Sequence, residues 1–124
     1  MKPVGRKRWV VSGGHIPLRS TGREPEFTSF DRLSILNVSD QTAEIDITLY
    51  YSDQAPVGPY HLKIDARRVR KFRFNDLIDP EAVLLDRDYG ALIESSVPVV
   101  VQFTRQSTAQ AANGLLGTMA FPLD

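Results

Sequence analysis

A dense run of basic side chains is the feature of this sequence with the clearest chemical potential. Arg67, Arg68, Arg70, Lys71 and Arg73 lie within one short segment. A planar guanidinium group donates paired hydrogen bonds to a carboxylate, a phosphate or a sugar hydroxyl. The same side chains would also form ion pairs with Asp65, Asp76 or Asp79, or with a neighbouring subunit. The residues themselves leave both interpretations open.

Groups suited to general acid–base or metal chemistry are sparse. His15 and His61 lie far apart in the sequence, and the alternation around His61 favours a strand residue that faces solvent. Glu24 and Glu26 are the residue type that glycoside hydrolysis uses, although carboxylates on a polar segment are usually only hydrated. The absence of cysteine excludes thiol catalysis, cysteine zinc sites and disulfides. We therefore expect no enzyme, no metal and no cofactor.

Aromatic and polar side chains supply a second set of candidates. Aromatic faces stack on the apolar side of sugar rings, and the residues that could do so are Trp9, Tyr50, Tyr51 and Tyr60. The alternative is that Trp9 and Tyr51 are core residues. Gln102 and Arg105 emerge from a strongly apolar stretch, so each needs a partner, which is either another side chain or a ligand.

These side chains must be positioned by strands. Residues 43–51 alternate strictly between apolar and polar side chains, which predicts a strand with one buried and one wet face. Further strands are predicted over residues 8–12, 33–38, 60–64, 67–74, 89–95, 97–104 and 116–121. Eight short strands and almost no helix predict an all-β protein, an antiparallel β-sandwich of jelly-roll or immunoglobulin-like type.

The connections between these strands are rich in turn signals. Gly13-Gly14 indicates a turn, and residues 15–31 lack any period, which predicts a long surface loop. The irregular spacing of Val69, Phe72 and Phe74 favours a β-bulge near Arg70. Residues 81–85 could form one helical turn, and residues 107–112 have moderate helix propensity.

The chain is short and electrically balanced. Its 124 residues predict one domain, 1–124, and its 15 basic and 15 acidic side chains argue against a general polyanion-binding protein. The longest unbroken apolar stretch, residues 97–101, is far shorter than the roughly 20 residues that cross a bilayer. The basic start of the chain lacks the apolar segment of a secretory signal, so we expect a cytoplasmic protein that does not span a membrane.

Several strings, taken together and in order, resemble one known family. They are Tyr50-Tyr-Ser-Asp53, Pro56-Val-Gly-Pro-Tyr60, Ala66-Arg-Arg68, Arg73-Phe-Asn-Asp-Leu77, and Val97-Pro-Val-Val-Val-Gln102 with Thr104-Arg105. The resemblance is to the Anabaena sensory rhodopsin transducer family and extends from about Trp9 to Ala120.

The resemblance implies a small cytoplasmic jelly-roll-like sandwich that assembles as a homotetramer. It also implies a role in receiving a signal from a membrane photoreceptor, a link to DNA, and, in the wider family, binding of sugar-related small molecules. The matching positions are Trp9, Ile16-Pro17, Glu26, Arg67, Arg68, Asn75, Asp76, Gln102 and Arg105. Two departures are His15, where the family is expected to carry Tyr, and the C-terminal residues 121–124.

We therefore expect a non-enzymatic sensory or binding module that takes a small polar, sugar-like metabolite and relays the signal to a partner. The alternative is a soluble transducer that docks to a membrane photoreceptor or binds DNA. The expected ligand-binding residues are Trp9, His15, Glu26, Tyr60, Arg67, Arg68, Asn75, Asp76, Gln102 and Arg105. Whether they line a pocket or a subunit interface stays open at this point.

Overall fold

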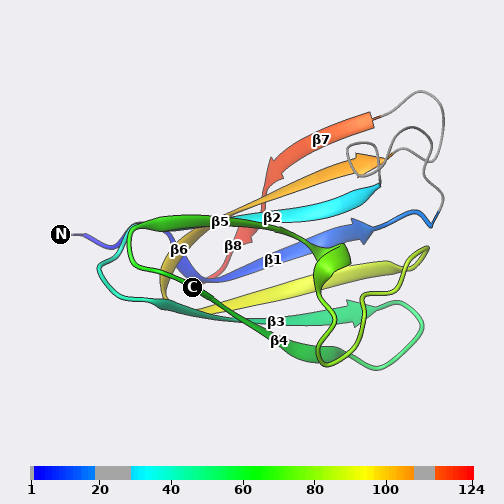
Figure 1. Ribbon diagram of the computed structural model, residues 1–124, viewed down its shortest axis with the longest axis horizontal. Coiled ribbons are helices and arrows are strands. Elements are labelled where there is room, and N and C mark those ends of the chain that lie inside the picture. The colour runs from blue at the N-terminus through cyan, green and yellow to red at the C-terminus, as the bar shows by residue number, and fades with distance from the viewer. Residues whose placement is uncertain (1, 19–28, 108–113) are drawn as a thin grey trace.

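The structure is a computed structural model that describes residues 2–18, 29–107 and 114–124. These residues form strands and one short 3₁₀ helix, η1, as predicted for an all-β protein (Figure 1). The elements are β1 (Arg6–His15), β2 (Phe30–Asn37), β3 (Ala43–Tyr51), β4 (Val57–Ile64), β5 (Arg68–Arg73), η1 (Phe74–Asp76), β6 (Asp88–Ser107), β7 (Gly114–Met119) and β8 (Phe121–Pro122).

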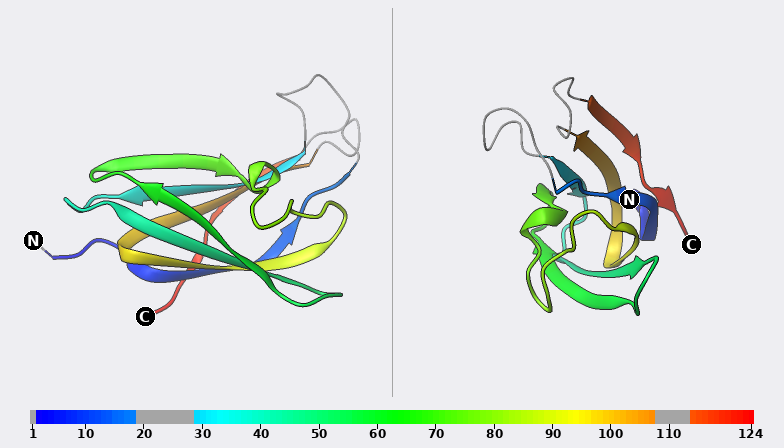
Figure 2. Two further views of the ribbon diagram at one scale, coloured as in Figure 1. Left: turned by 60° about the horizontal axis from the view of Figure 1, so that its bottom comes forward. Right: turned by 90° about the vertical axis from the view of Figure 1, so that its right-hand side faces the viewer.

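One long strand, β6, belongs to both sheets of the fold. Its first part, residues 88–99, pairs with β1 and β3, and its second part, residues 100–107, pairs with β2 and β7. The first sheet therefore has the order β4-β3-β6-β1-β8 and the second the order β5-β2-β6-β7, with every pairing antiparallel. Figures 1 and 2 show β6 turning back on itself, so that both of its ends lie at one end of the sandwich.

The core lies between the two sheets and follows the alternation of their strands. In β3 the inward residues Ile45, Ile47 and Leu49 are completely buried, while Glu44 and Asp46 are exposed, as predicted. In β2 the inward positions Leu33 and Ile35 are also completely buried. Burial of these branched side chains, each contributing about 1.5–3 kcal/mol, holds the sheets together.

Several local predictions are wrong, each for a physical reason. Gly13 and Gly14 do not end β1, because Gly14 still pairs with Tyr89 of β6. β5 pairs with β2 without any shift in register, so it has no bulge; its apolar spacing is irregular because Val69 faces outward and Phe74 lies beyond the strand in η1.

Further along the chain, two predicted strands are a single one. Residues 89–95 and 97–104 are both part of β6, because Pro98 is accommodated where the strand bends between the sheets. Residues 81–85 do not form a helical turn. The helix predicted at 107–112 lies almost wholly outside the described residues, and Ser107 itself ends β6.

Candidate functional site

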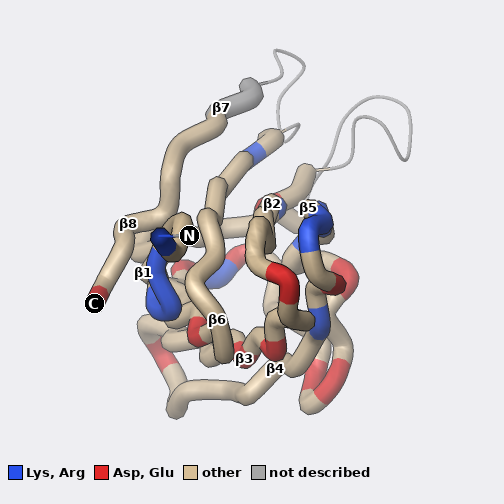
Figure 3. Tube along the Cα trace, turned by 90° about the vertical axis from the view of Figure 1, so that its left-hand side faces the viewer, with Lys and Arg blue, Asp and Glu red and all other residues tan. Residues whose placement is uncertain are grey.

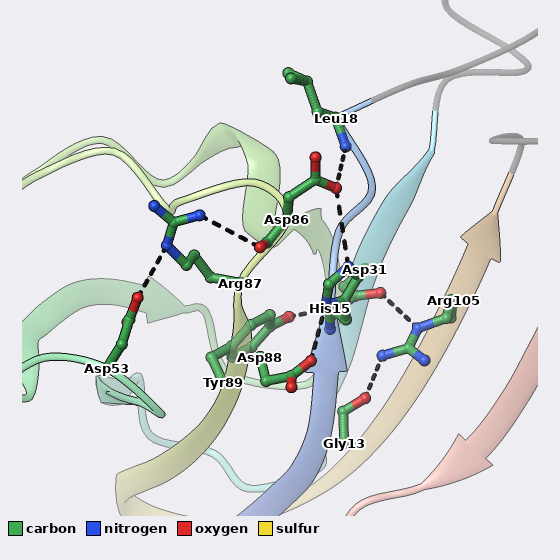
Figure 4. Close-up of polar contacts among 10 residues, drawn as sticks. All are labelled: Gly13, His15, Leu18, Asp31, Asp53, Asp86, Arg87, Asp88, Tyr89 and Arg105. Carbon is green, nitrogen blue, oxygen red and sulfur yellow. Dashed lines mark hydrogen bonds and ion pairs between the residues drawn. The ribbon is translucent and has the colours of Figure 1, made fainter.

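Polar side chains from four chain segments meet at one end of the sandwich. The end of β1, the start of β2 and both ends of β6 lie there, as Figure 1 shows. The close-up in Figure 4 places Asp31, His15, Tyr89 and Arg105 together at this end. The bend in β6 makes this possible, because it brings residues 88–89 and residue 105 of one strand to the same place.

Asp31 is the centre of this cluster and is completely buried. Its Oδ2 accepts hydrogen bonds from the backbone N–H of His15 at 2.9 Å and from the hydroxyl of Tyr89 at 2.7 Å. Its Oδ1 accepts from Nε of Arg105 at 3.1 Å. A buried carboxylate is tolerated only when it is paired and hydrogen-bonded. Asp31 meets that condition and thereby ties β2 to β1 and to both ends of β6.

Arg105 neutralises Asp31 and reaches across to β1. Its Nη2 donates to the backbone carbonyl of Gly13, and its guanidinium lies 5.8 Å from the ring centroid of Phe103. The side chain is 29% exposed, whereas that of Asp31 is fully buried. Arg105 is therefore the charged group of this pair that faces solvent.

Tyr89 packs closely against the glycine that precedes His15. A Cβ atom added to Gly14 would lie 2.2 Å from the Tyr89 ring, so only glycine leaves room for that ring. Burial raises the pKa of Tyr89, and the neighbouring Asp31 carboxylate raises that pKa further. The hydroxyl therefore keeps its proton and remains a donor to Asp31.

His15 closes the cluster on its solvent side, where two carboxylates face its ring. Nδ1 lies 2.9 Å from Oδ1 of Asp88, and Nε2 lies 3.9 Å from Oδ1 of Asp86. The same oxygen of Asp86 accepts a 2.9 Å hydrogen bond from the backbone N–H of Leu18. Figure 4 shows these contacts, together with the ion pair of Arg87 and Asp53 at 3.1 Å.

A groove of about 280 Å³ runs beside Arg105, between β1 and the strands β7 and β8. Its apolar walls include Val11, Phe103 and Phe121, and its polar edge includes the hydroxyls of Ser12 and Thr118. The ring of Phe121 is 67% exposed, which is unusual for a side chain of this size. The groove thus combines an exposed aromatic ring with hydroxyl and guanidinium groups.

The structure brings only some of the predicted ligand-binding residues to this end. His15 and Arg105 meet around Asp31, as described above. Trp9 is buried, and its Nε1 donates to the carbonyl of Val99 at 3.1 Å. Tyr60 is also buried, and its hydroxyl donates to the carbonyl of Glu81 at 2.6 Å. Both positions are those of core residues, the alternative noted for Trp9 in the sequence.

The remaining predicted residues are dispersed. Asn75 lies in η1 and donates to the carbonyl of Ser29 at 3.0 Å, while Asp76 forms an ion pair with Arg73 at 2.9 Å. That pair was one of the alternatives for the basic run. Gln102 is exposed on β6, and Arg67 and Arg68 are exposed at the other end of the sandwich, next to the start of β5. Glu26, like Glu24, lies outside the described residues.

The two histidines remain separate, and each has its own carboxylates. His61 is exposed, as predicted, and its Nδ1 lies 2.8 Å from Oδ1 of Asp46. The hydrogen bond to Asp46 raises the pKa of His61, and it outweighs the desolvation of the ring, which lowers that pKa. Within the described ranges, no group of three or more His, Cys, Asp or Glu side chains is arranged to hold a metal ion.

Asp31 is the central residue that the sequence prediction missed. A signal for it exists, because Asp31, Leu33, Ile35 and Asn37 occupy alternate positions of one strand. Extending the alternation of the two apolar residues in both directions predicts two inward-facing polar residues. Both are completely buried in the structure. Buried polar side chains require organised partners, which makes them better pointers to a site than exposed charges.

In chemical terms the cluster is suited to recognition. Both oxygens of Asp31 are occupied by donors, and both ring nitrogens of His15 face carboxylates. Arg105 has donors beyond the two that bond to Asp31 and Gly13, and these lie beside the groove.

In the part of the chain that the structure describes, no helix is long and apolar enough to cross a bilayer.

Comparison with known proteins agrees with this architecture. The family model described as Anabaena sensory rhodopsin transducer matches residues 4–122. A solved structure of the Anabaena sensory rhodopsin transducer is 47% identical, covers 84% of this chain and 90% of its own, and superposes with a TM-score of 0.77. The crystal structure of Thermotoga maritima 1070 is 28% identical, with 96% of both chains covered and a TM-score of 0.83.

No curated protein matches the sequence. The family match nevertheless spans nearly the whole chain, and the 47% identical relative shares its fold. The chain therefore belongs to the sensory rhodopsin transducer family.

Proposed function

We propose that this protein is a non-enzymatic sensory module that binds a small polar, sugar-like metabolite in the groove beside Arg105 and relays its occupancy to a partner. The groove carries the proposal. Its volume of about 280 Å³ lies just below the range for pockets that take drug-sized ligands, about 300–1,000 Å³, which suits a smaller molecule such as a single sugar ring. A sugar ring has an apolar face and a rim of hydroxyls, which match Phe121 and the polar edge formed by Ser12, Thr118 and Arg105.

The cluster around Asp31 supplies the route for the signal. Arg105 bonds to both Asp31 and Gly13, and Asp31 in turn bonds to His15 and Tyr89. A ligand that draws Nη2 of Arg105 away from Gly13 changes the contacts of β1 and both ends of β6. Occupancy of the groove is thus coupled to the hydrogen bonds that connect β1, β2 and both ends of β6 at this end of the sandwich.

A thermal-shift screen of monosaccharides and sugar acids tests this proposal. A ligand at 100 times its dissociation constant raises the free energy of unfolding by about 2.7 kcal/mol. Thr118→Val removes a hydroxyl at the groove and weakens the effect, whereas Thr48→Val, on β3 in the first sheet, leaves it unchanged. If every compound fails to shift the wild-type melting temperature at millimolar concentration, the ligand proposal is wrong.

The partner that we propose is a membrane photoreceptor, reached from the cytoplasm. The name of the 47% identical relative supports this choice. Binding of the purified protein to a microbial rhodopsin in lipid nanodiscs, measured by biolayer interferometry, tests it. We expect saturable binding at moderate ionic strength. Nanodiscs without rhodopsin are the control, and equal binding to them contradicts the proposal.

A second candidate function is DNA binding, favoured by one observation. The exposed cations Arg68, Arg70 and Lys71 lie on the edge strand β5, close to Lys63 of β4. Binding through several such groups must weaken steeply with salt. Fluorescence anisotropy with a duplex DNA tests this function. The absence of a complex at about 50 mM salt excludes it, because screening is then weak.

We further propose that the chain assembles as a homotetramer. Leu36, Val69 and Met119 are 40%, 55% and 50% exposed on β2, β5 and β7, which leaves apolar area available on the second sheet. Sedimentation equilibrium tests the assembly. Val69→Asp should lower the mass, whereas Ile78→Asp, at an exposed loop position, should not. A monomeric wild-type protein would contradict the proposal.

A further inference from the structure

A second cavity lies at the opposite end of the sandwich, where β6 bends. It measures about 490 Å³ and is formed by the N-terminal segment, the β2–β3 turn, the β4–β5 turn and the bend itself. Figure 3 faces this end and shows Lys and Arg positions on β1 and β5. It is separate from the groove beside Arg105, so an inference about it does not rest on the proposed function.

A buried polar residue organises the two turns that form this cavity. Asn37 is completely buried, and its Nδ2 donates to the carbonyls of Gln41 at 2.7 Å and Ile64 at 3.2 Å. Its Oδ1 accepts from the backbone N–H of Ser39 at 3.0 Å and from the Ser39 hydroxyl at 2.7 Å. The β2–β3 turn and the end of β4 are therefore held in one fixed arrangement before any ligand arrives.

Arg67 is held in an unusual backbone conformation at the edge of the cavity. Its φ is +55°, in the left-handed region that residues other than glycine and asparagine seldom adopt. The backbone N–H of Arg67 donates to the carbonyl of Ser39 at 3.0 Å, which fixes this conformation. The guanidinium, in contrast, makes no hydrogen bond or ion pair with any described residue. A strained residue that presents a free charge is typical of a binding site.

The charges of the lining select the class of ligand. Lys2 and Arg67 are cationic and Asp40 is anionic, so two positive charges face one negative charge. One excess positive charge suits a monoanion and disfavours a phosphate dianion or a polyanion, which Asp40 repels. The guanidinium fork fits a carboxylate in bidentate geometry.

The walls of the cavity specify the rest of the ligand. Val4, Val38, Val97 and Pro98 contribute apolar surface around the charged edge. We propose that this cavity binds a small monocarboxylate with a branched apolar body, with its carboxylate on Arg67 and Lys2 and its body against these walls. A neutral sugar leaves the Arg67 charge without a partner and is therefore a poor fit.

A titration with 2-methylpropanoate, followed through the backbone amide signals of the ¹⁵N-labelled full chain, tests the proposal. We expect saturable shifts at Ser39, Gln41 and Arg67, and none with the neutral isostere 2-methylpropanamide. Arg67→Asn suits the same backbone conformation but removes the charge. It should weaken binding at least about tenfold, because a charge-assisted bidentate contact is lost. Arg68→Gln, the neighbouring cation outside this cavity, should leave the affinity within about twofold.

Four results would overturn the proposal. The first is binding of the amide as tightly as the acid, since the carboxylate is then not recognised. The second is an equal response to inorganic phosphate at matched ionic strength, which means that any anion suffices. The third is an equal loss in Arg67→Asn and Arg68→Gln. The fourth is the absence of any saturable shift in the wild-type protein. Sugar-induced shifts at Gly13 and His15 report the other site and are independent of these outcomes.

Discussion

Two inward-facing polar residues of β2 determine the chemistry at the two ends of the core. Asp31 and Asn37 occupy the same face of the strand as Leu33 and Ile35, and both are fully buried. Each is surrounded by donors and acceptors from chain segments distant in sequence. Since an unsatisfied buried polar group costs about 1–3 kcal/mol, each of them fixes the position of its partners.

Tyr89→Phe tests how strongly the structure depends on Asp31. The change removes the hydroxyl that donates to Asp31 at 2.7 Å and keeps the ring, which lies 5.2 Å from that of Phe74. We expect the free energy of unfolding, measured with urea, to fall by about 1–3 kcal/mol, because a hydrogen bond to a buried charge is lost.

Tyr60→Phe is the matched control for Tyr89→Phe. It removes a hydroxyl from a tyrosine that is also buried, and this hydroxyl donates to a neutral carbonyl, that of Glu81. Its expected cost is smaller, about 0.5–1.5 kcal/mol. If the two variants lose equal stability, the charge of Asp31 does not strengthen the hydrogen bond from Tyr89.

His61 provides a pH-dependent prediction on the outer face of the first sheet. The hydrogen bond to Asp46 raises the pKa of His61 above 6.5, its ordinary value. Stabilisation from the charged form is thus fully present below pH 6.5 and is lost as pH rises through the folded-state pKa. A pH titration of the His61 ring C–H signals by NMR should give a pKa above 6.5, and Asp46→Asn should lower it.

Glu44→Gln is the comparison for Asp46→Asn. Glu44 lies 3.4 Å from Nε2 of His61, and its contribution to the raised pKa is smaller than the Asp46 hydrogen bond. We therefore expect a smaller decrease in the pKa of His61. A larger decrease in Glu44→Gln than in Asp46→Asn contradicts the assignment.

At the level of single residues, Arg105 was singled out as a polar group beside an apolar strand, and His15 through the resemblance to the family. Both lie in the cluster around Asp31. Asp31 was missed because the segment before Leu33 was interpreted as an irregular loop, which concealed the alternation that continues back to residue 31. Trp9 was offered as a stacking surface, but aromatic type alone does not distinguish a platform from a core residue.

At the level of elements, β6 is the strand that gives the molecule its architecture. It is 20 residues long and contributes to both sheets, so that Tyr89 and Arg105 reach the same Asp31. Strict alternation predicted β3 with its correct ends, because a strand with one buried and one wet face alternates apolar and polar residues along its length. A bend within a strand has no comparable pattern of residues. The sequence around Pro98 was therefore interpreted as a break between two strands.

The two adjacent glycines at the end of β1 give a prediction at this scale. A Cβ at Gly14 would lie 2.2 Å from the Tyr89 ring, whereas a Cβ at Gly13 would meet nothing within 4 Å. We expect Gly14→Ala to cost about 1–3 kcal/mol through overpacking. Gly13→Ala should change stability by about 0.5 kcal/mol or less, as for an ordinary exposed position. Urea unfolding of both variants measures the contrast, and equal costs would mean that the ring moves aside freely.

At the level of the whole molecule, the two sheets cannot separate without breaking β6. The strand pairs with β1 and β3 in the first sheet and with β2 and β7 in the second, and the core between the sheets is one continuous cluster. Asp31 adds a polar connection at one end, between β2 and β1. We infer that the described part of the fold behaves as one cooperative unit.

This cooperativity can be measured with a natural probe. Trp9 is the single tryptophan, is buried in the first sheet, and reports the unfolding of that sheet by fluorescence. Amide exchange at Leu33 and Ile35 reports the second sheet. We expect the free energy of unfolding from Trp9 fluorescence to equal that from exchange at Leu33 and Ile35. In Tyr89→Phe, both should fall by the same amount, because the lost contact joins the sheets. A second sheet that opens at a lower free energy than the first contradicts this, and implies that the bend in β6 acts as a hinge.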